Sequence, residues 1–124
     1  MLDVGLIPTR ERPVDIFFKH TKLAKVFNDG ARLHKEYGPK NAQLIKNRMA
    51  VLSAAACLAD VPVSPPERRH LLTGDLPGCY AVDLQHPFRL VFAPVADPVP
   101  TRRDGGHDLQ KITSIIILQV VDYH

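Results

Sequence analysis

The first half of the chain has the apolar spacing of helices. Residues 20–37 and 40–59 repeat apolar side chains every three or four positions, which is the period of an amphipathic helix. The Asn-Asp-Gly run at residues 28–30 is expected to divide the first helix in two, and the Gly-Pro pair at residues 38–39 to end it. A short β-prone run at residues 14–18 comes before both helices and predicts a first strand.

In the second half the period changes to that of a strand. Residues 79–84 and 88–92 alternate apolar with polar or small side chains and predict an antiparallel pair, joined by a turn at residues 86–87 (His-Pro). The near-continuous apolar run within residues 112–123 predicts a central strand that is buried on both faces. Residues 94–111 hold three prolines and two glycines, and we expect an exposed, mobile loop there.

This order of elements predicts an α+β domain, in which two or three N-terminal helices pack on a small, mainly antiparallel sheet. With 124 residues the chain is expected to form one domain. Residues 1–13 are expected to be a leader outside it, and the proline-rich residues 60–67 a linker within it. One face of such a sheet remains open to bind another molecule.

Composition and charge narrow the class of protein. Apolar residues make up 45% and charged residues 23%, as in an ordinary globular protein. No apolar run is long enough to cross a bilayer and the N-terminus lacks the pattern of a secretory signal, so we expect a cytoplasmic protein. Cys57 and Cys79 are then expected to be free, buried thiols.

The basic residues are concentrated in the helical half. Residues 1–60 carry ten Lys and Arg against six Asp and Glu, whereas residues 61–124 carry six against seven. A basic half suits a polyanion such as RNA, although a solvated helical surface has the same composition. If RNA is the partner, Lys40, Lys46 and Arg48 are the candidate contacts.

Three short stretches hold the residues that suit chemistry. The sequence has no metal-ligand spacing and no phosphate-binding glycine motif, so we expect neither a metal nor another cofactor. The three stretches are Arg68-Arg69-His70 before a glycine-rich turn, Arg89 inside an aromatic strand, and the last three residues, Asp122-Tyr123-His124. Each also has a plainer interpretation, as a solvated strand end, an exposed strand arginine and a frayed terminus.

Together these stretches resemble the HigB-like killer toxins of the RelE/ParE superfamily. The resemblance rests on RRHLLTGDLPGCYAVDLQHPFRLVF at residues 68–92 and on VVDYH at residues 120–124. The helical segments at residues 22–38 (KLAKVFNDGARLHKEYG) and 41–61 (NAQLIKNRMAVLSAAACLADV) are also similar to that family. The resemblance implies a RelE-like fold.

The family resemblance also implies a reaction and its partners. It implies a ribosome-dependent endoribonuclease that cuts messenger RNA without a metal and is neutralised by a HigA-like helix-turn-helix antitoxin. The ribose 2′-hydroxyl attacks the adjacent phosphate and the 5′-oxygen leaves, so a base, an acid and cations are needed. Proton transfer would be assigned to His70 and His124, and phosphate binding to Arg89. The supporting residues would be Arg68 and Arg69 beside the phosphate, Asp122 to orient His124, and Tyr123 to stack on a base or to bond a phosphate.

The chain departs from the family's pattern at two places. Many relatives carry a lysine where this chain has Thr73, which removes one phosphate contact. Residues 94–111 are longer than the family's pattern, and we expect them to cover or extend the site. Because His70 and Arg89 lie at strand ends, we expect both on one concave face of the sheet, near the C-terminus.

Two other hypotheses stay open beside the nuclease. One is a RelE/ParE relative that acts by binding alone, against DNA gyrase or only its antitoxin, and Thr73 favours it. The combination of His70, Arg89 and His124 favours the nuclease, because a gyrase binder needs no paired acid and base. The other hypothesis is an unrelated α+β binding module.

Overall fold

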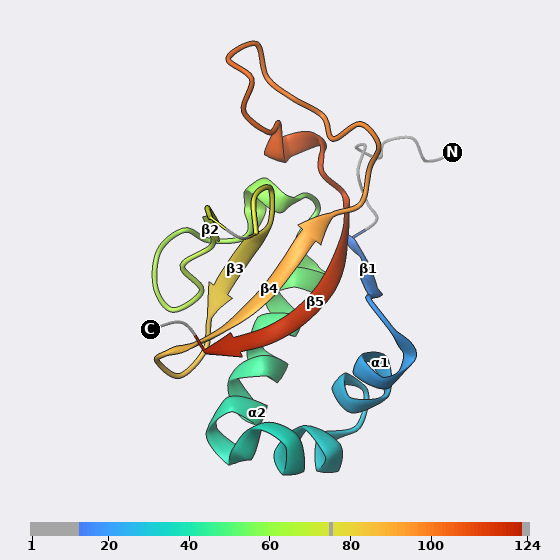
Figure 1. Cartoon of the computed structure of the whole chain (residues 1–124), viewed down its shortest axis with the longest axis vertical. Coiled ribbons are helices and arrows are strands. Elements are labelled where there is room, and N and C mark those ends of the chain that lie inside the picture. The colour runs from blue at the N-terminus through green and yellow to red at the C-terminus, as the bar shows by residue number, and fades with distance from the viewer. Residues whose placement is uncertain (1–12, 75, 123–124) are drawn as a thin grey trace, which may run out of the picture.

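The computed structural model describes residues 13–74 and 76–122, which form two helices and one five-stranded mixed sheet (Figure 1). The protein is therefore α+β, as its periodicity predicts. The strands are β1 (Asp15–Phe18), β2 (His70–Leu71), β3 (Tyr80–Asp83), β4 (Phe88–Pro94) and β5 (Ser114–Asp122). The helices are α1 (Thr21–Phe27) and α2 (Gly30–Ala54), and single 3-10 turns lie at Leu58–Asp60 and Leu109–Lys111.

The sheet is mainly antiparallel, as predicted. Its strands lie in the order β1-β5-β4-β3-β2. β1 runs parallel to β5, and the other three pairings are antiparallel. β3 and β4 form the expected hairpin around the turn at residues 86–87, with Tyr80 opposite Phe92 and Asp83 opposite Arg89.

The predicted break at residues 28–30 is confirmed, whereas residues 38–39 form a kink within α2 and do not end it. The Asp29 side chain accepts hydrogen bonds from the backbone N–H groups of Ala31 and Arg32 and so begins α2 after a short gap. Gly38, with φ of 83°, then bends α2, a conformation that favours glycine. In the part of the chain that the structure describes, no helix combines the length and the apolar character needed to cross a membrane.

The second predicted helix ends earlier than expected, at Ala54 and not at residue 59. The backbone just beyond it bonds to distant segments and does not continue the helix. The carbonyl of Ala55 accepts a hydrogen bond from the N–H of Val14 at 2.7 Å, and the N–H of Leu58 donates to the carbonyl of Ile112 at 2.9 Å. These contacts tie residues 55–58, which precede the expected linker at residues 60–67, to the segments that lead into β1 and β5.

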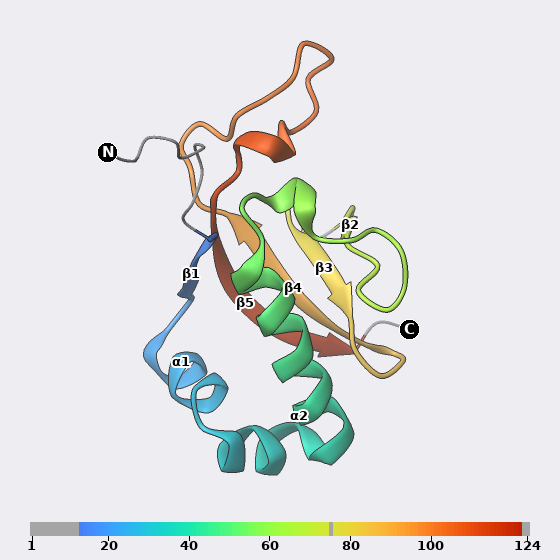
Figure 2. The same cartoon turned by 180° about the vertical axis from the view of Figure 1, so that it is seen from behind.

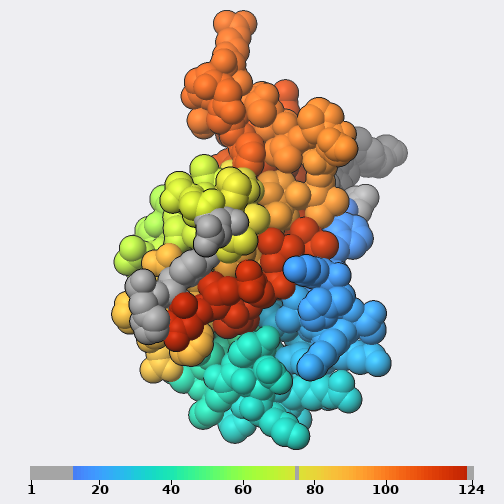
Figure 3. All heavy atoms as spheres, in the orientation of Figure 1, coloured from blue at the N-terminus to red at the C-terminus, as the bar shows by residue number. Residues whose placement is uncertain are grey.

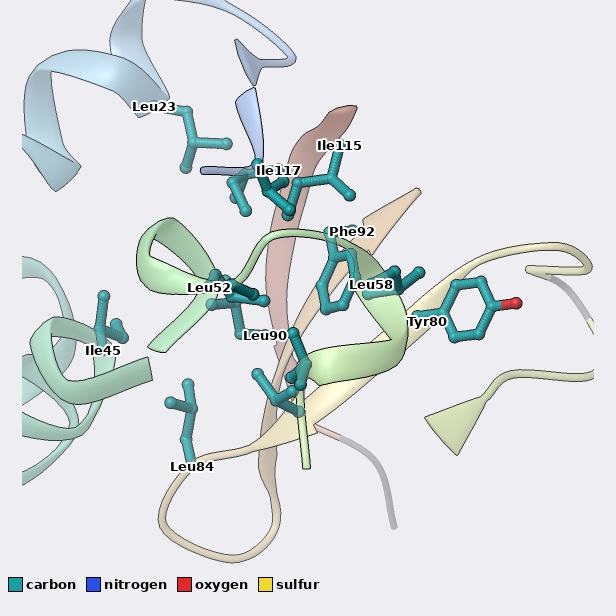
Figure 4. Packing of buried hydrophobic residues seen from close by; sticks show 14 of the residues in the cluster. Leu23, Ile45, Leu52, Leu58, Tyr80, Leu84, Leu90, Phe92, Ile115 and Ile117 are labelled. Carbon is teal, nitrogen blue, oxygen red and sulfur yellow. The ribbon is translucent and has the colours of Figure 1, made fainter. Parts of the chain in front are cut away.

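The main core lies between α2 and one face of the sheet, which we call the inner face (Figure 2). Fully buried side chains from both layers meet there (Figure 4). They include Ile45 and Leu52 from α2, Leu90 and Phe92 from β4, and Ile115 and Ile117 from β5. The opposite, outer face carries only a small cluster, in which buried Leu72, Ala81 and Val91 pack with partly buried neighbours.

β5 is not buried on both faces, so this expectation was wrong. Ile115 and Ile117 are buried on the inner face, whereas Ile116 is half-buried and Gln119 is exposed. The space-filling view shows β5, in red, open on the outer face (Figure 3). The helices cover one face only, and a run of β-branched residues cannot reveal which layers cover a strand. A register shift also leaves Leu118 as the extra residue of a β-bulge.

The segment between β4 and β5 projects beyond the end of the sheet (Figure 1). Residues 101–105 are exposed, as predicted. The base of the segment is nevertheless attached, because His107 bridges to Thr101 and its Nδ1 lies 2.8 Å from the Tyr80 hydroxyl. Leu109 packs against the main core.

Candidate functional site

Two of the predicted stretches meet on the outer face of the sheet. His70 lies opposite Ala81, and Arg89 lies opposite Asp83. Because Ala81 and Asp83 are two positions apart along β3, their side chains and those of their partners point to the same face. His70 and Arg89 therefore share a face as predicted, and Arg89 lies opposite Val121, next to the end of β5.

Asp83 links the basic residues of this face. Its Oδ2 lies 3.3 Å from Nε of Arg68, and its Oδ1 lies 3.7 Å from Nε of Arg89. One carboxylate thus lies between two guanidinium groups. We call Arg68, His70, Asp83 and Arg89 the outer-face site. Asp83 was not among the predicted site residues, although the hairpin register around the turn at residues 86–87 pairs it with Arg89.

The inner layer holds the backbone of Asp83 in place. Its N–H donates to the carbonyl of Glu67 at 2.8 Å, and its carbonyl accepts from Nε of Arg48 at 2.6 Å. Two residues later, the N–H of Gln85 donates to Oδ1 of Asn41 at 2.9 Å. α2 therefore fixes the β3–β4 hairpin, and with it the outer-face site.

This contact corrects the expectation for Arg48. Lys40 and Lys46 are exposed as expected, but Arg48 is only 5% exposed. Arg48 follows Ile45 by three positions and precedes Leu52 by four, so the helical period places it on the buried stripe. Its guanidinium bonds the hairpin and is not available to RNA.

Arg68 has a backbone conformation that few residues with a side chain adopt. Its φ is 50°, in the left-handed region, which costs about 1–2 kcal/mol for a residue other than glycine. The Arg68 carbonyl lies 2.7 Å from Nδ1 of His70. Strain of this kind persists where the surrounding structure imposes it, and functional sites are a common location.

The contact with Arg68 sets the tautomer of His70. A carbonyl only accepts hydrogen bonds, so Nδ1 carries the proton and the lone pair of the neutral ring lies on Nε2. This is the tautomer in which Nε2 can act as a base. Nε2 is buried, and it has no hydrogen-bond partner within residues 13–74 and 76–122. The proton acceptor of the outer-face site is therefore enclosed.

Arg69 lies apart from the outer-face site. Its Nε donates to the carbonyl of Val61 at 2.9 Å, and partial burial lowers the pKa of its guanidinium. Burial raises the pKa of Tyr80, and the positive charges of Arg69 and Arg102 oppose this only in part. Arg69 thus belongs to the surroundings of Tyr80 and not to those of Arg89.

Asp122 points to the other side of the sheet. Val121 packs in the small outer cluster, whereas Val120 packs against the main core. By alternation the side chain of Asp122, which lies opposite Phe88, belongs to the inner side. Asp122 and Arg89 therefore belong to opposite faces of the sheet. The predicted site residues Tyr123 and His124 lie outside the described residues.

The surface beside the outer-face site is shallow. A hollow of about 40 Å³ is lined by the β3–β4 turn together with Asp83 and Arg89. That volume suits a water molecule and not a nucleotide. A larger hollow of about 300 Å³ lies between the helical layer and β5, near Tyr37 and Gln119, and contains none of the predicted site residues. Any RNA at the outer-face site would therefore bind on the surface.

Metal-ligating and thiol groups add little to this site. Among the residues that the structure describes, no group of three His, Cys, Asp or Glu side chains is arranged to hold a metal ion. Cys57 and Cys79 are free thiols, as expected, but both are half-buried and not fully buried. Burial raises the pKa of the Cys79 thiol.

No protein-family model matches this chain, and no curated protein matches its sequence. The similarity to RelE/ParE toxins thus rests on the short motifs of the sequence, and the activity that it implies is a proposal.

Proposed function

We propose that the protein is a RelE-like toxin of the HigB kind, which cuts messenger RNA on the ribosome. The observation that supports this best is the grouping of Arg68, His70 and Arg89 on the outer face of the sheet. Residues 68–70 and β4 contribute these side chains. The two arginines supply the cations, and His70 the proton acceptor, that metal-independent cleavage of RNA requires.

In this proposal each residue of the group has one role. The guanidinium groups of Arg68 and Arg89 bind the scissile phosphate and stabilise its developing charge. Nε2 of His70 accepts the proton of the 2′-hydroxyl, whose oxygen then bonds to phosphorus while the bond from phosphorus to the 5′-oxygen breaks. The leaving 5′-oxygen takes a proton from an acid, the role that the family resemblance gives to His124. Binding of RNA must first uncover Nε2 of His70.

The proposed partners follow from this activity. The exposed Lys40 and Lys46 contribute positive charge for docking on ribosomal RNA. A helix-turn-helix antitoxin neutralises the toxin, and the protein acts in the cytoplasm, where ribosomes are. No cofactor is required.

A binding-only relative is the second candidate, and particular observations favour it. Asp83 already pairs with both Arg68 and Arg89, and Nε2 of His70 is enclosed. Thr73 also stands where many relatives carry a lysine. Such a protein would bind gyrase or its antitoxin without cutting RNA.

Induced expression in bacteria separates the two candidates. The nuclease proposal expects growth arrest together with new messenger RNA 5′ ends inside translated frames. His70→Ala and Arg89→Ala should each reduce cleavage about a hundredfold, the usual scale for a general base or a charge-stabilising group. His34→Ala, on the exposed surface of α2, is the matched control and should cleave normally.

Deletion of Tyr123 and His124 tests the proposed acid in the same assay. We expect it to abolish both arrest and cleavage while the protein remains folded and binds its antitoxin. Growth arrest without new 5′ ends would favour the binding-only candidate. Normal cleavage by folded His70→Ala would contradict the assignment of the base.

A further inference from the structure

We propose that the Asp83 carboxylate is a built-in competitor for RNA phosphate at the outer-face site. The inference rests on the proposed function in taking an RNA phosphodiester as the ligand. It adds a feature that the resemblance does not supply, because Asp83 has no role in the reaction described above. Asp83 would lower the affinity for RNA by occupying the arginines that receive it.

The geometry of the three side chains supports this. Each carboxylate oxygen of Asp83 faces the Nε of a different arginine, at 3.3 Å for Arg68 and 3.7 Å for Arg89. A phosphate that bridges two guanidinium groups presents two oxygens in the same way. The carboxylate therefore occupies the position that a bridging phosphate would take.

The exposure of the side chains indicates how the exchange would occur. The Asp83 side chain is 26% exposed, whereas those of Arg89 and Arg68 are 36% and 61% exposed. The arginines thus reach further into solvent than the carboxylate, and a phosphate can approach them from outside. Ion pairs at this exposure and distance are weak, so a phosphate can replace the carboxylate.

Asp83 itself cannot withdraw with its backbone. Its N–H and carbonyl are bonded to Glu67 and Arg48, so only its side chain can rotate. With Asp83 ionised, the two arginines and the carboxylate carry a net charge of about +1, and without it about +2. The negative charge stays near the bound phosphate and opposes it.

The opposite role, in which Asp83 positions the arginines for RNA, predicts a change of the opposite sign. Removing a positioning residue would weaken binding, whereas removing a competitor strengthens it. The arginine side chains are partly exposed, so holding them in one conformation contributes little. A unit charge a few ångströms from the phosphate has the larger effect.

Binding of a short RNA to the full chain tests the proposal. The probe is a fluorescein-labelled RNA with 2′-O-methyl groups, which cannot be cut, and its Kd is measured by anisotropy at low salt. Asp83→Asn keeps the shape of the side chain, and we expect Kd to fall about fivefold, the effect of one charge at about 4 Å through water. Asp83→Glu restores the charge and should bind much like the original protein.

Asp104→Asn is the matched control for net charge. Asp104 pairs with Arg102 in the projecting segment, away from the outer-face site, and its loss should leave Kd nearly unchanged. In a protein that already carries Arg89→Gln, Asp83→Asn should increase the affinity for RNA by a smaller factor, because one of the two arginines that Asp83 occupies is then missing. Inorganic phosphate added as a competitor should displace the RNA at lower concentration from Asp83→Asn than from Asp104→Asn.

Unchanged or weaker RNA binding by folded Asp83→Asn would overturn the proposal, and so would an equal gain from Asp104→Asn. The proposal would also be overturned if Asp83→Asn bound inorganic phosphate more tightly but bound RNA no more tightly than the original protein. If Asp83→Asn does not fold, as judged by circular dichroism, Asp83→Ser provides the same comparison. A gain in binding by a protein that never cuts messenger RNA would contradict the proposed function alone.

Discussion

Replacing Arg48 by methionine should destabilise the protein, because this arginine joins α2 to the β3–β4 hairpin. The change removes a 2.6 Å hydrogen bond from a charged donor to the carbonyl of Asp83, and such bonds contribute about 1.5–3 kcal/mol. Methionine fills most of the space of the arginine stem, so the cavity contribution is small. Relief from burying a charge recovers part of the loss. We expect a net decrease of about 2 kcal/mol in the free energy of unfolding.

Urea unfolding followed by far-ultraviolet circular dichroism measures this loss. The midpoint should fall while the slope m stays the same, because the change affects stability and not the surface exposed on unfolding. The melting temperature should fall by about 8 °C, at about 4 °C for each kcal/mol in a domain of this size. Lys46→Met, at an exposed position of the same helix, is the control and should change stability by less than about 0.5 kcal/mol.

Equal stability of the Arg48 and Lys46 variants would refute this reasoning. It would mean that the bond to the Asp83 carbonyl contributes nothing in water. If Arg48→Met also bound RNA more weakly while remaining stable, the original expectation of an RNA contact would regain support. The buried position of Arg48 predicts the reverse, a less stable protein in which RNA binding changes only through the hairpin.

Three further predictions concern other parts of the fold. Gly38→Ala should cost about 1 kcal/mol because φ is positive there. Gly30→Ala, at the first residue of α2, should be neutral or stabilising by urea titration, because φ is not positive there and an added Cβ meets only the movable end of the Lys46 side chain. Tyr80→Phe should cost about 1 kcal/mol by the same assay, because it removes the hydrogen bond to His107; an unchanged midpoint would contradict this. Burial raises the pKa of the Cys79 thiol. In a variant whose other cysteine, Cys57, is replaced by serine, iodoacetamide at pH 8 should therefore alkylate Cys79 more slowly in the folded than in the urea-unfolded protein. The folded state then holds this proton more tightly, so stability should decline as pH rises above the ordinary thiol pKa.

Local patterns predicted the parts of the fold that depend on neighbours in sequence. Alternation over residues 79–92 was sufficient for the hairpin, and the turn residues at 28–30 and 38–39 marked the break and the kink in the helices. The same alternation places His70 and Arg89 on one face once β2 is paired. These features follow from side-chain period and backbone preference, which are properties of short segments.

The errors arose where distant segments decide the outcome. The charge of Arg48 predicts a surface position, but its spacing from Ile45 and Leu52 places it inside, where the carbonyl of Asp83 is its hydrogen-bond partner. The end of α2 depends on Val14 and Ile112, which no local pattern includes. The ion pair of Asp83 with Arg68 depends on how residues 60–70 return to the sheet, which no local pattern predicts.

The attachment of residues 95–111 makes the protein convenient to label. The segment leaves the sheet at the far end of β4, which is about 17 Å along the strand from Arg89. From there it projects beyond the end of the sheet (Figure 1). Its exposed tip at residues 103–105 is a suitable place to insert a short epitope or attach a fluorophore, because loops tolerate added length at small thermodynamic cost. A probe there would report on the intact protein while Arg68 and Arg89 stay open to their ligand.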